Sequence, residues 1–274
     1  MYKLLQILLL AVFTVFHAQE STDWDIRFYH EMKDGQAFVY ADNSEFAPMS
    51  AEFKFTLENM TTSLKDGSTV IIPPQAKKVL VSTLTPVKPK SSIAFRYSMG
   101  INIGNTLQHE YDQDHVYQLP FAAGKTQKIF QGYHGKFSHQ NVKALDFDLK
   151  EGEEVYAARG GVVVEMVEHH NRSCAQLNCA KYNNKIVIMH EDGTFADYSH
   201  LKLNGSAVKK GDSVKVGQLI GYSGSTGFAT GPHLHFGVYL PRIDGSRDYI
   251  ETKFQTAASP AELLTEGRSY QRKK

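Results

Sequence analysis

The chain has 274 residues, of which 42% are apolar and 22% are charged, and its formal net charge is +1. This composition is typical of a soluble globular protein that is long enough to bury a sizeable core. The near-neutral charge excludes a nucleic-acid-binding protein that relies on a basic surface, so partners must be recognised at local sites.

The first residues have the pattern of an export signal. Lys3 precedes an apolar run over residues 4–16, and Ala18 follows shortly after it. The run is too short and too interrupted by polar residues for a typical transmembrane helix. We expect residues 1–18 to be a signal peptide, with an uncleaved anchor as the alternative. No later segment reaches membrane-spanning length, so we expect an exported protein of the periplasm, the cell envelope or the extracellular space.

Residues 19–130 contain short alternating runs separated by turn residues. In AEFKFTLEN (51–59), Phe53, Phe55 and Leu57 fall on one face with a period of two, as in a half-buried strand. Similar runs are STVIIPP (68–74), KVLVSTL (78–84) and SIAFRYSMG (92–100). Several such strands at short spacing predict a β-sandwich-like accessory domain. It contains no catalytic constellation, and its role is structural or substrate-positioning.

Residues 131–258 predict a second, more apolar β-domain. The runs GGVVVEMVE (160–168) and NKIVIMH (184–190) are typical of sheet interiors, and EDG (191–193) predicts a hairpin turn. In residues 259–274, Ser259 as N-cap, Pro260 in the first turn and Gly267 as a stop predict a short helix with a frayed tail. We therefore expect an all-β fold with this single short helix.

Two cysteines lie five residues apart in the polar stretch NRSCAQLNCAKYNN. In an oxidising compartment, such a pair in a loop predicts a disulfide between Cys174 and Cys179. A zinc knuckle would need two further soft ligands, and the chain has no other cysteine.

Two histidines and one aspartate make the candidate metal site. In TGPHLHF (230–236), His233 and His235 lie two apart, so a strand directs both to one face and Leu234 to the core. In FSHQNVKALDFDLKEG (137–152), Asp146 lies on the polar face of a strand that follows a loop beginning at His139. His139, Asp146 and His235 would supply three ligands and leave a fourth tetrahedral position for water, as in a catalytic zinc site.

His200 stands near the end of TFADYSHL (194–201), on the face that we assign to Tyr198 as well. A histidine that is free of the metal is a suitable general base or transition-state donor, because its usual pKa is near neutrality. The glycine-rich SGSTGFATG (223–231) has no GK[ST] and no following helix, so a nucleotide-binding loop is excluded.

These motifs together carry a family resemblance. ALDFDLKEGEEVYAARGGVVVEMVE, HEDGTFADYSHL, VKKGDSVKVGQLIGYSGSTG and GPHLHF occur in this order between about residues 131 and 239. In this order they resemble the lysostaphin-type, or β-lytic, LytM-like zinc metallopeptidases. The resemblance implies an antiparallel β-groove fold and cleavage of peptide bonds in bacterial peptidoglycan, often at glycine or D-amino-acid linkages. It also implies that His139, Asp146 and His235 hold one zinc ion, and that His200 and His233 are the catalytic histidines.

One departure from the family pattern leaves alternatives for the ligands. The common first motif separates its histidine and aspartate by three residues, whereas six residues separate His139 from Asp146 here, which we interpret as an insertion. His134 is the alternative histidine and Asp148 the alternative carboxylate.

Two other functions are compatible with the sequence. Some relatives lose metal ligands and act as cell-wall-binding activators of amidases, but all five positions are filled here. A general exported protease of glycine-rich proteins would use the same chemistry.

We expect zinc to lower the pKa of a bound water molecule, and His200 or His233 to take its proton or to stabilise the oxyanion. Tyr133 and Tyr198 are further phenolic donors, and the assignment between the two histidines is left open.

Overall fold

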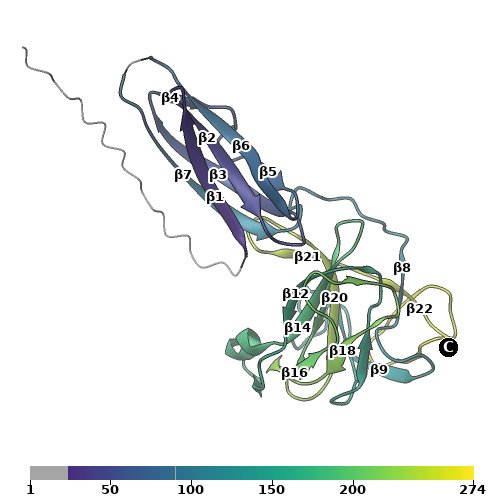
Figure 1. The fold of residues 1–274 in the computed structure, drawn as a ribbon. Coiled ribbons are helices and arrows are strands. Elements are labelled where there is room, and N and C mark those ends of the chain that lie inside the picture. Colours follow the sequence, from purple (N-terminus) through teal and green to yellow (C-terminus); the bar gives the residue numbers. More distant parts are fainter. Residues whose placement is uncertain (1–23, 90) are drawn as a thin grey trace, which may run out of the picture.

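A computed structural model describes residues 24–89 and 91–274, and the fold is all-β (Figure 1). An elongated lobe of long strands leads into a more compact lobe of shorter ones. Within the described residues the only helical element is a short 3₁₀ helix, η1 (Leu177–Tyr182). The predicted signal peptide, residues 1–18, lies outside the described residues. Over the described part of the chain, no helix has the length and apolar character needed to cross a bilayer.

The elongated lobe is a sandwich of two antiparallel sheets. One sheet has the order β1-β2-β6-β4, and the other has the order β5-β3-β7. Phe53 is buried, and Phe55 and Leu57 on the same face pack against the core between the sheets, as the alternation predicted. The strands are β1 (Ile26–Lys33), β2 (Gln36–Asn43), β3 (Met49–Glu58), β4 (Met60–Thr62), β5 (Thr69–Ile72), β6 (Ala76–Pro86) and β7 (Ala94–Ile103).

Two strands that begin before residue 130 pair with later parts of the chain. β8 (Val116–Gln118) pairs with β22 (Lys253–Gln255), and β9 (Thr126–Gln131) pairs with β10 (Ala144–Phe147) and β24 (Ser269–Gln271). The sandwich strands thus end at Ile103. The predicted boundary at residue 130 therefore falls within β9, a strand that is paired with strands of the second lobe. The division of the chain into two domains stays a prediction.

The second lobe is built on a nine-stranded sheet of order β17-β12-β14-β15-β20-β10-β9-β24, with β21 paired to β20. The hairpin predicted at residues 191–193 is confirmed, because β14 and β15 pair antiparallel across it. The remaining strands of this sheet are β10 (Ala144–Phe147), β12 (Gly161–Val167), β14 (Lys185–Met189), β15 (Phe195–Ser199), β17 (Ser213–Val214), β20 (Leu234–Pro241), β21 (Arg247–Ile250) and β24 (Ser269–Gln271).

Three small sheets complete the lobe, with the orders β11-β18-β16, β13-β19 and β23-β22-β8. The predicted disulfide between Cys174 and Cys179 is present and links β13 to η1. The strands are β11 (Glu154–Tyr156), β13 (Ser173–Cys174), β16 (Leu201–Ser206), β18 (Leu219–Ser223), β19 (Gly227–Phe228) and β23 (Glu262–Leu263).

The central sheet is buried on both faces, which explains why its strands are continuous apolar runs. In β14, Ile186 and Ile188 belong to the core of the second lobe, whereas Val187 belongs to the core shared with the sandwich. In β20, Phe236 faces the core of the second lobe, and Tyr239 faces the core that is shared with the sandwich. The sandwich therefore covers one end of a sheet face, and the other end of that face is left for the site described below.

Gly104 makes the close junction between the lobes possible. It has φ +87°, and a Cβ atom there would lie 2.7 Å from Pro241 and 2.9 Å from Phe195. Across the same junction, Asn102 Nδ2 donates to the Arg242 carbonyl at 2.7 Å. Any larger residue at position 104 would force the sandwich away from the sheet.

The predicted C-terminal helix is wrong, and so is the frayed tail. Ser259 lies in a turn, where its backbone N–H donates to Thr256 Oγ1, and β23 then pairs with β22. Tertiary pairing thus overrides the local capping pattern. The tail is anchored because Tyr270 in β24 is buried and Arg272 donates to the Phe121 carbonyl at 2.5 Å.

Candidate metal centre and groove

Strand pairing brings two of the predicted ligands face to face. β10 and β20 are antiparallel neighbours, and Asp146 lies directly opposite His235 in their register. Leu145 and Phe147, which flank Asp146, point to the core together with Leu234. Alternation along each strand therefore directs both polar side chains to the opposite face.

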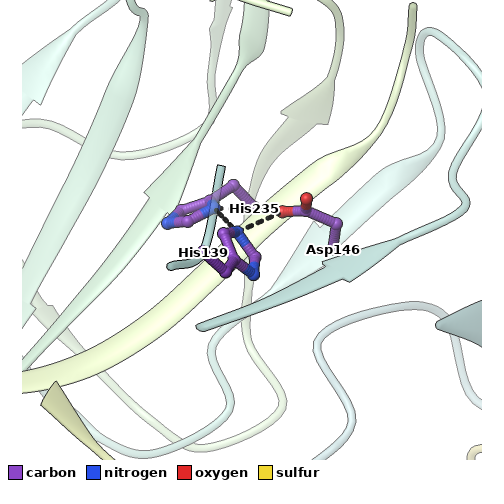
Figure 2. A group of neighbouring side chains, drawn as sticks. All are labelled: His139, Asp146 and His235. Atoms are coloured by element: carbon purple, nitrogen blue, oxygen red, sulfur yellow. Dashed lines mark hydrogen bonds and ion pairs between the residues drawn. The ribbon is translucent and has the colours of Figure 1, made fainter. Parts of the chain in front are cut away.

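The third predicted ligand, His139, comes from the loop between β9 and β10, and the three side chains point toward one another (Figure 2). His139 Nε2 lies 3.1 Å from His235 Nδ1 and 3.3 Å from Asp146 Oδ1, and His235 Nδ1 lies 3.0 Å from Asp146 Oδ1. Three ligand atoms bonded to one tetrahedral zinc ion are separated by about 3.3 Å. The arrangement therefore fits the zinc ion that the sequence implied.

Hydrogen bonds around the triangle orient its atoms. His139 Nδ1 donates to the Gly132 carbonyl at 3.1 Å, which places the ring proton on Nδ1 and leaves a lone pair on Nε2. Gln131 Nε2 donates to Asp146 Oδ2 at 2.9 Å and to Ser138 Oγ at 2.7 Å. The second carboxylate oxygen is thus satisfied, and Oδ1 is left toward the histidines.

The electrostatics of the cluster favour a positive charge. Burial raises the pKa of the Asp146 carboxyl, but the adjacent His139 and His235 rings lower it by more, so this pKa lies well below its usual range. Burial lowers the pKa of His235, but Asp146 raises it by more. A carboxylate and two imidazoles that are largely hidden from water provide the donor set that a divalent cation satisfies.

The alternative ligands lie elsewhere. Asp148 is exposed, one full strand step beyond Asp146. His134 is exposed as well and has a positive φ of 57° at the start of the loop. Neither belongs to a cluster of metal-binding groups among the described residues. The structure thus brings together the preferred set, whose role as zinc ligands remains a proposal.

His200 and His233 stand beside this cluster, with ring centroids 4.5 Å apart. His200 Nδ1 donates to the Thr226 carbonyl at 2.7 Å, and His233 Nδ1 donates to the Gly231 carbonyl at 2.9 Å. Each ring therefore carries its proton on Nδ1 and presents Nε2 as an acceptor. His233 Nε2 lies 3.9 Å from Asp146 Oδ1, at the edge of the cluster.

Burial keeps both histidines neutral. It lowers the pKa of His200 to about 3, with a further contribution from His233 and His235. It also lowers the pKa of His233. Near pH 7 two neutral imidazoles thus lie next to a carboxylate and its two histidine neighbours.

All five residues line one groove of about 350 Å³ on the sheet face. Its walls are largely apolar, and Phe137 and Phe228 stack there with ring centroids 5.9 Å apart. The groove is lined by residues between positions 130 and 249, so no described sandwich residue lines it. The other lining residues are Phe130, Ser138, Val142, Leu177, Ala180, Asn183, Asp197, Ser199, Ala229, Thr230 and Tyr249.

A polar chain in the wall of the groove was not predicted from the sequence. Arg247 Nη1 donates to Asp197 Oδ2 at 2.8 Å, Ser199 Oγ donates to Asp197 Oδ1 at 2.5 Å, and Asn183 Nδ2 donates to Ser199 Oγ at 2.8 Å. Ser199 lies opposite His235 in the β15–β20 register. The alternation Phe195, Asp197, Ser199 was the available signal, since two polar residues interrupt an otherwise apolar strand.

The predicted tyrosine donors are wrong. Tyr198 is fully buried in the core, where its hydroxyl accepts a hydrogen bond from the Ala158 N–H at 2.8 Å. The Tyr133 hydroxyl donates to the Thr252 carbonyl at 3.1 Å. Tyr198 also does not share a face with His200, because His200 has a φ of 66° that breaks the strand alternation. Neither hydroxyl lines the groove.

Comparison with known proteins assigns the second lobe to a family. The sequence pattern of peptidase family M23 matches residues 140–247. These residues form a peptidase family M23 domain. The match contains Asp146, His200, His233 and His235 and begins one residue after His139, so the position of His139 rests on the geometry above.

Three curated relatives share this segment. Glycyl-glycine endopeptidase ALE-1 of Staphylococcus capitis is 41% identical over 98 residues, which are 35% of this chain and 24% of the relative. Lysostaphin of Staphylococcus simulans is 38% identical over 92 residues (34% and 17%). Peptidoglycan DD-endopeptidase ShyA of Vibrio cholerae is 41% identical over 91 residues (33% and 18%). The chain thus matches about a quarter or less of the length of these relatives.

Among solved structures, the catalytic domain of lysostaphin from Staphylococcus simulans is 29% identical. The similarity covers 47% of this chain and 94% of that domain, with a TM-score of 0.33.

Proposed function

We propose that the chain is an exported zinc metalloendopeptidase that hydrolyses peptide bonds in peptidoglycan. The observation that carries the proposal is the convergence of His139 Nε2, Asp146 Oδ1 and His235 Nδ1 beside two neutral histidines in one groove. The M23 domain supports the reaction class. The names of two relatives, a glycyl-glycine endopeptidase and a peptidoglycan DD-endopeptidase, support peptide bonds of peptidoglycan as the substrate.

His139, Asp146 and His235 would hold the zinc ion. Bound there, zinc supplies a Lewis acid that polarises the scissile carbonyl and lowers the pKa of water from about 15.7 toward about 7. Gln131 and the Gly132 carbonyl keep the Asp146 and His139 ligand atoms directed to this point.

His200 and His233 then handle the proton. Each presents an unprotonated Nε2, so either accepts a proton from the attacking water. The ring that accepts the proton becomes a donor to the oxyanion and to the leaving amine. The hydrogen bonds to the Thr226 and Gly231 carbonyls stabilise the cation that forms, because both carbonyls accept from Nδ1–H. Among the described residues that line the groove, the only carboxylates are Asp146, which we assign to the metal, and Asp197, which Arg247 engages.

The groove favours an internal peptide bond over a chain end. None of its lining residues is a lysine or an arginine that would bind a terminal carboxylate. The nearby Arg247 is engaged by Asp197 at 2.8 Å. The apolar walls suit an uncharged, extended peptide, as in a wall cross-link.

The test is digestion of purified peptidoglycan by the zinc-loaded protein, with released fragments identified by mass spectrometry. Walls that contain glycyl-glycine linkages and walls that are joined by D-amino-acid linkages are compared. Chelated protein and His233→Ala serve as controls. Metal-dependent release of new amino termini supports the proposal and names the bond. Binding of zinc and wall without cleavage of either type would replace it with a non-enzymatic binding module.

A further inference from the structure

The backbone of His200 is held in an unfavourable conformation. Its φ of 66° is in the left-handed region, which costs a residue other than glycine about 1 kcal/mol or more. Two hydrogen bonds compensate for this cost. The His200 N–H donates to Asn183 Oδ1 at 2.9 Å, and the ring Nδ1 donates to the Thr226 carbonyl at 2.7 Å.

Asn183 has both ends of its side-chain amide engaged. Its Oδ1 accepts from His200, while its Nδ2 donates to Ser199 Oγ at 2.8 Å. Ser199 continues to Asp197, which Arg247 neutralises. The amide is therefore fixed in one orientation, and its oxygen can face only the His200 N–H.

Both partners of His200 are attached to the disulfide loop, which we define as residues 172–183. Asn183 directly follows η1, and η1 contains Cys179, which is bonded to Cys174 in β13 (the short green coil at the side of the compact lobe in Figure 1). β13 pairs in parallel with β19, which begins directly after Thr226. The disulfide therefore links η1, which precedes Asn183 and the bond to the His200 backbone, to β13, which is paired with the segment after Thr226 and the bond to the His200 ring.

Close packing reinforces this link. Gly227 N–H donates to the Arg172 carbonyl at 2.9 Å, and the Asn184 N–H donates to Thr226 Oγ1 at 3.0 Å. Gly227 has φ +85°, and a Cβ atom there would lie 2.9 Å from the Asn183 Cα. The two segments therefore approach each other with no room for a side chain between them.

We propose that Asn183 is a positioning residue for His200 and that the Cys174–Cys179 disulfide keeps it in place. This inference rests on the proposed catalytic role of His200. The side chain of Asn183 hydrogen-bonds to Ser199 and to the His200 N–H and not to His139, Asp146 or His235, so it acts on the turnover step and not on metal content. A displacement of a catalytic group by about 1 Å costs on the order of 100-fold in rate.

The experiment compares Asn183→Ala and the double variant Cys174→Ser/Cys179→Ser with the full wild-type chain. Gln176→Ala is the matched control, because Gln176 is exposed in the same loop and makes no side-chain cap hydrogen bond. Steady-state kinetics on a cross-linked peptide are measured with zinc content. The ring nitrogens of His200 are followed by ¹⁵N NMR, with assignment by a His200→Gln variant.

We expect Asn183→Ala to lower kcat at least about tenfold with little change in zinc content. Its His200 ring should lose the fixed Nδ1–H tautomer signal, and the double cysteine variant should change in the same direction. Gln176→Ala should behave as wild type. A wild-type kcat together with a wild-type His200 spectrum in Asn183→Ala would overturn the inference. If the wild-type protein cleaves no peptide, the proposed function fails, and the His200 spectrum alone still decides whether Asn183 positions the ring.

Discussion

The ion pair at the wall of the groove, between Asp197 and Arg247, gives the sharpest stability prediction. Asp197 and Arg247 meet at 2.8 Å, with 6% and 32% of their side chains exposed, and the Arg247 guanidinium also lies 4.3 Å from the Tyr239 ring centroid. Replacing Arg247 by Met keeps much of the stacking volume but leaves a buried carboxylate without its partner. Removal of one member of a buried pair costs about 3–5 kcal/mol.

The exposed third of Arg247 reduces this value, because solvent already screens part of the attraction. We therefore expect Arg247→Met to lower the free energy of unfolding by about 2–3 kcal/mol. For a chain of this size the loss corresponds to a fall in Tm of about 4–10 °C. Urea denaturation followed by circular dichroism measures the difference at pH 7. The matched control is the double variant Asp197→Asn/Arg247→Met, which removes the unpaired charge and should recover part of the loss.

The difference in the free energy of unfolding between wild type and Arg247→Met should also depend on pH, with a defined sign. Burial raises the pKa of Asp197, but the positive charges of Arg247 and Lys185 lower it by more. The resulting pKa is about 2. The pKa of Asp197 is therefore lower in the folded protein than in the unfolded chain, where it is about 3.9. Its ionised form stabilises the folded state above about pH 3.9, and this stabilisation is lost as the pH falls toward 2. The difference between wild type and Arg247→Met should therefore shrink below about pH 4. A difference under about 0.5 kcal/mol at pH 7, or one that does not change with pH, would refute the pairing as an energetic unit.

Four further outcomes follow from the groove. Asp146→Asn should abolish zinc retention after dialysis, whereas His134→Ala should retain zinc; equal retention in the two variants would contradict the ligand assignment. Because protons compete with the metal for the cluster, zinc affinity measured by competition with a chelating dye should fall as the pH is lowered, and an affinity that does not vary with pH would argue against these ligands. Chelation should lower the Tm of the wild-type protein, since a ligand bound only to the folded state stabilises it, and an unchanged Tm would mean that the site binds weakly. Phe137→Ala, which removes the stack on Phe228, should raise KM about two- to tenfold with kcat unchanged, and an unchanged KM would exclude this wall from substrate binding.

Much of the site could be predicted because strand periodicity is a local property. The alternation in ALDF directs Asp146 away from Leu145 and Phe147, and the same rule directs His235 away from Leu234. The apolar runs likewise predicted the strands of the all-β fold. His139 was proposed from its place before the strand of Asp146 and from the resemblance, but strand periodicity does not determine how its loop returns to the sheet. Hydrogen bonds within the loop do so: His139 Nδ1 donates to the Gly132 carbonyl, and Gln131 Nε2 donates to Ser138 Oγ.

The parts that were missed depend on tertiary contacts. Tyr198 and His200 are two apart, yet the left-handed φ of His200 sends its ring to the groove while Tyr198 stays in the core. The helix predicted from Ser259 is absent because pairing of β23 with β22 outweighs a short capping signal. Asp197 was overlooked since its partner, Arg247, lies fifty residues further along the chain.

Titration of turnover against zinc tests whether the protein is a zinc-dependent endopeptidase. Metal-free protein is loaded with increasing zinc, and the amino termini released from cross-linked peptidoglycan fragments are counted at each ratio. Turnover should rise in proportion to bound zinc, saturate at a single ion per chain and stay at background in Asp146→Asn. Full turnover by the metal-free protein, or wild-type turnover by Asp146→Asn, would contradict the proposed zinc dependence.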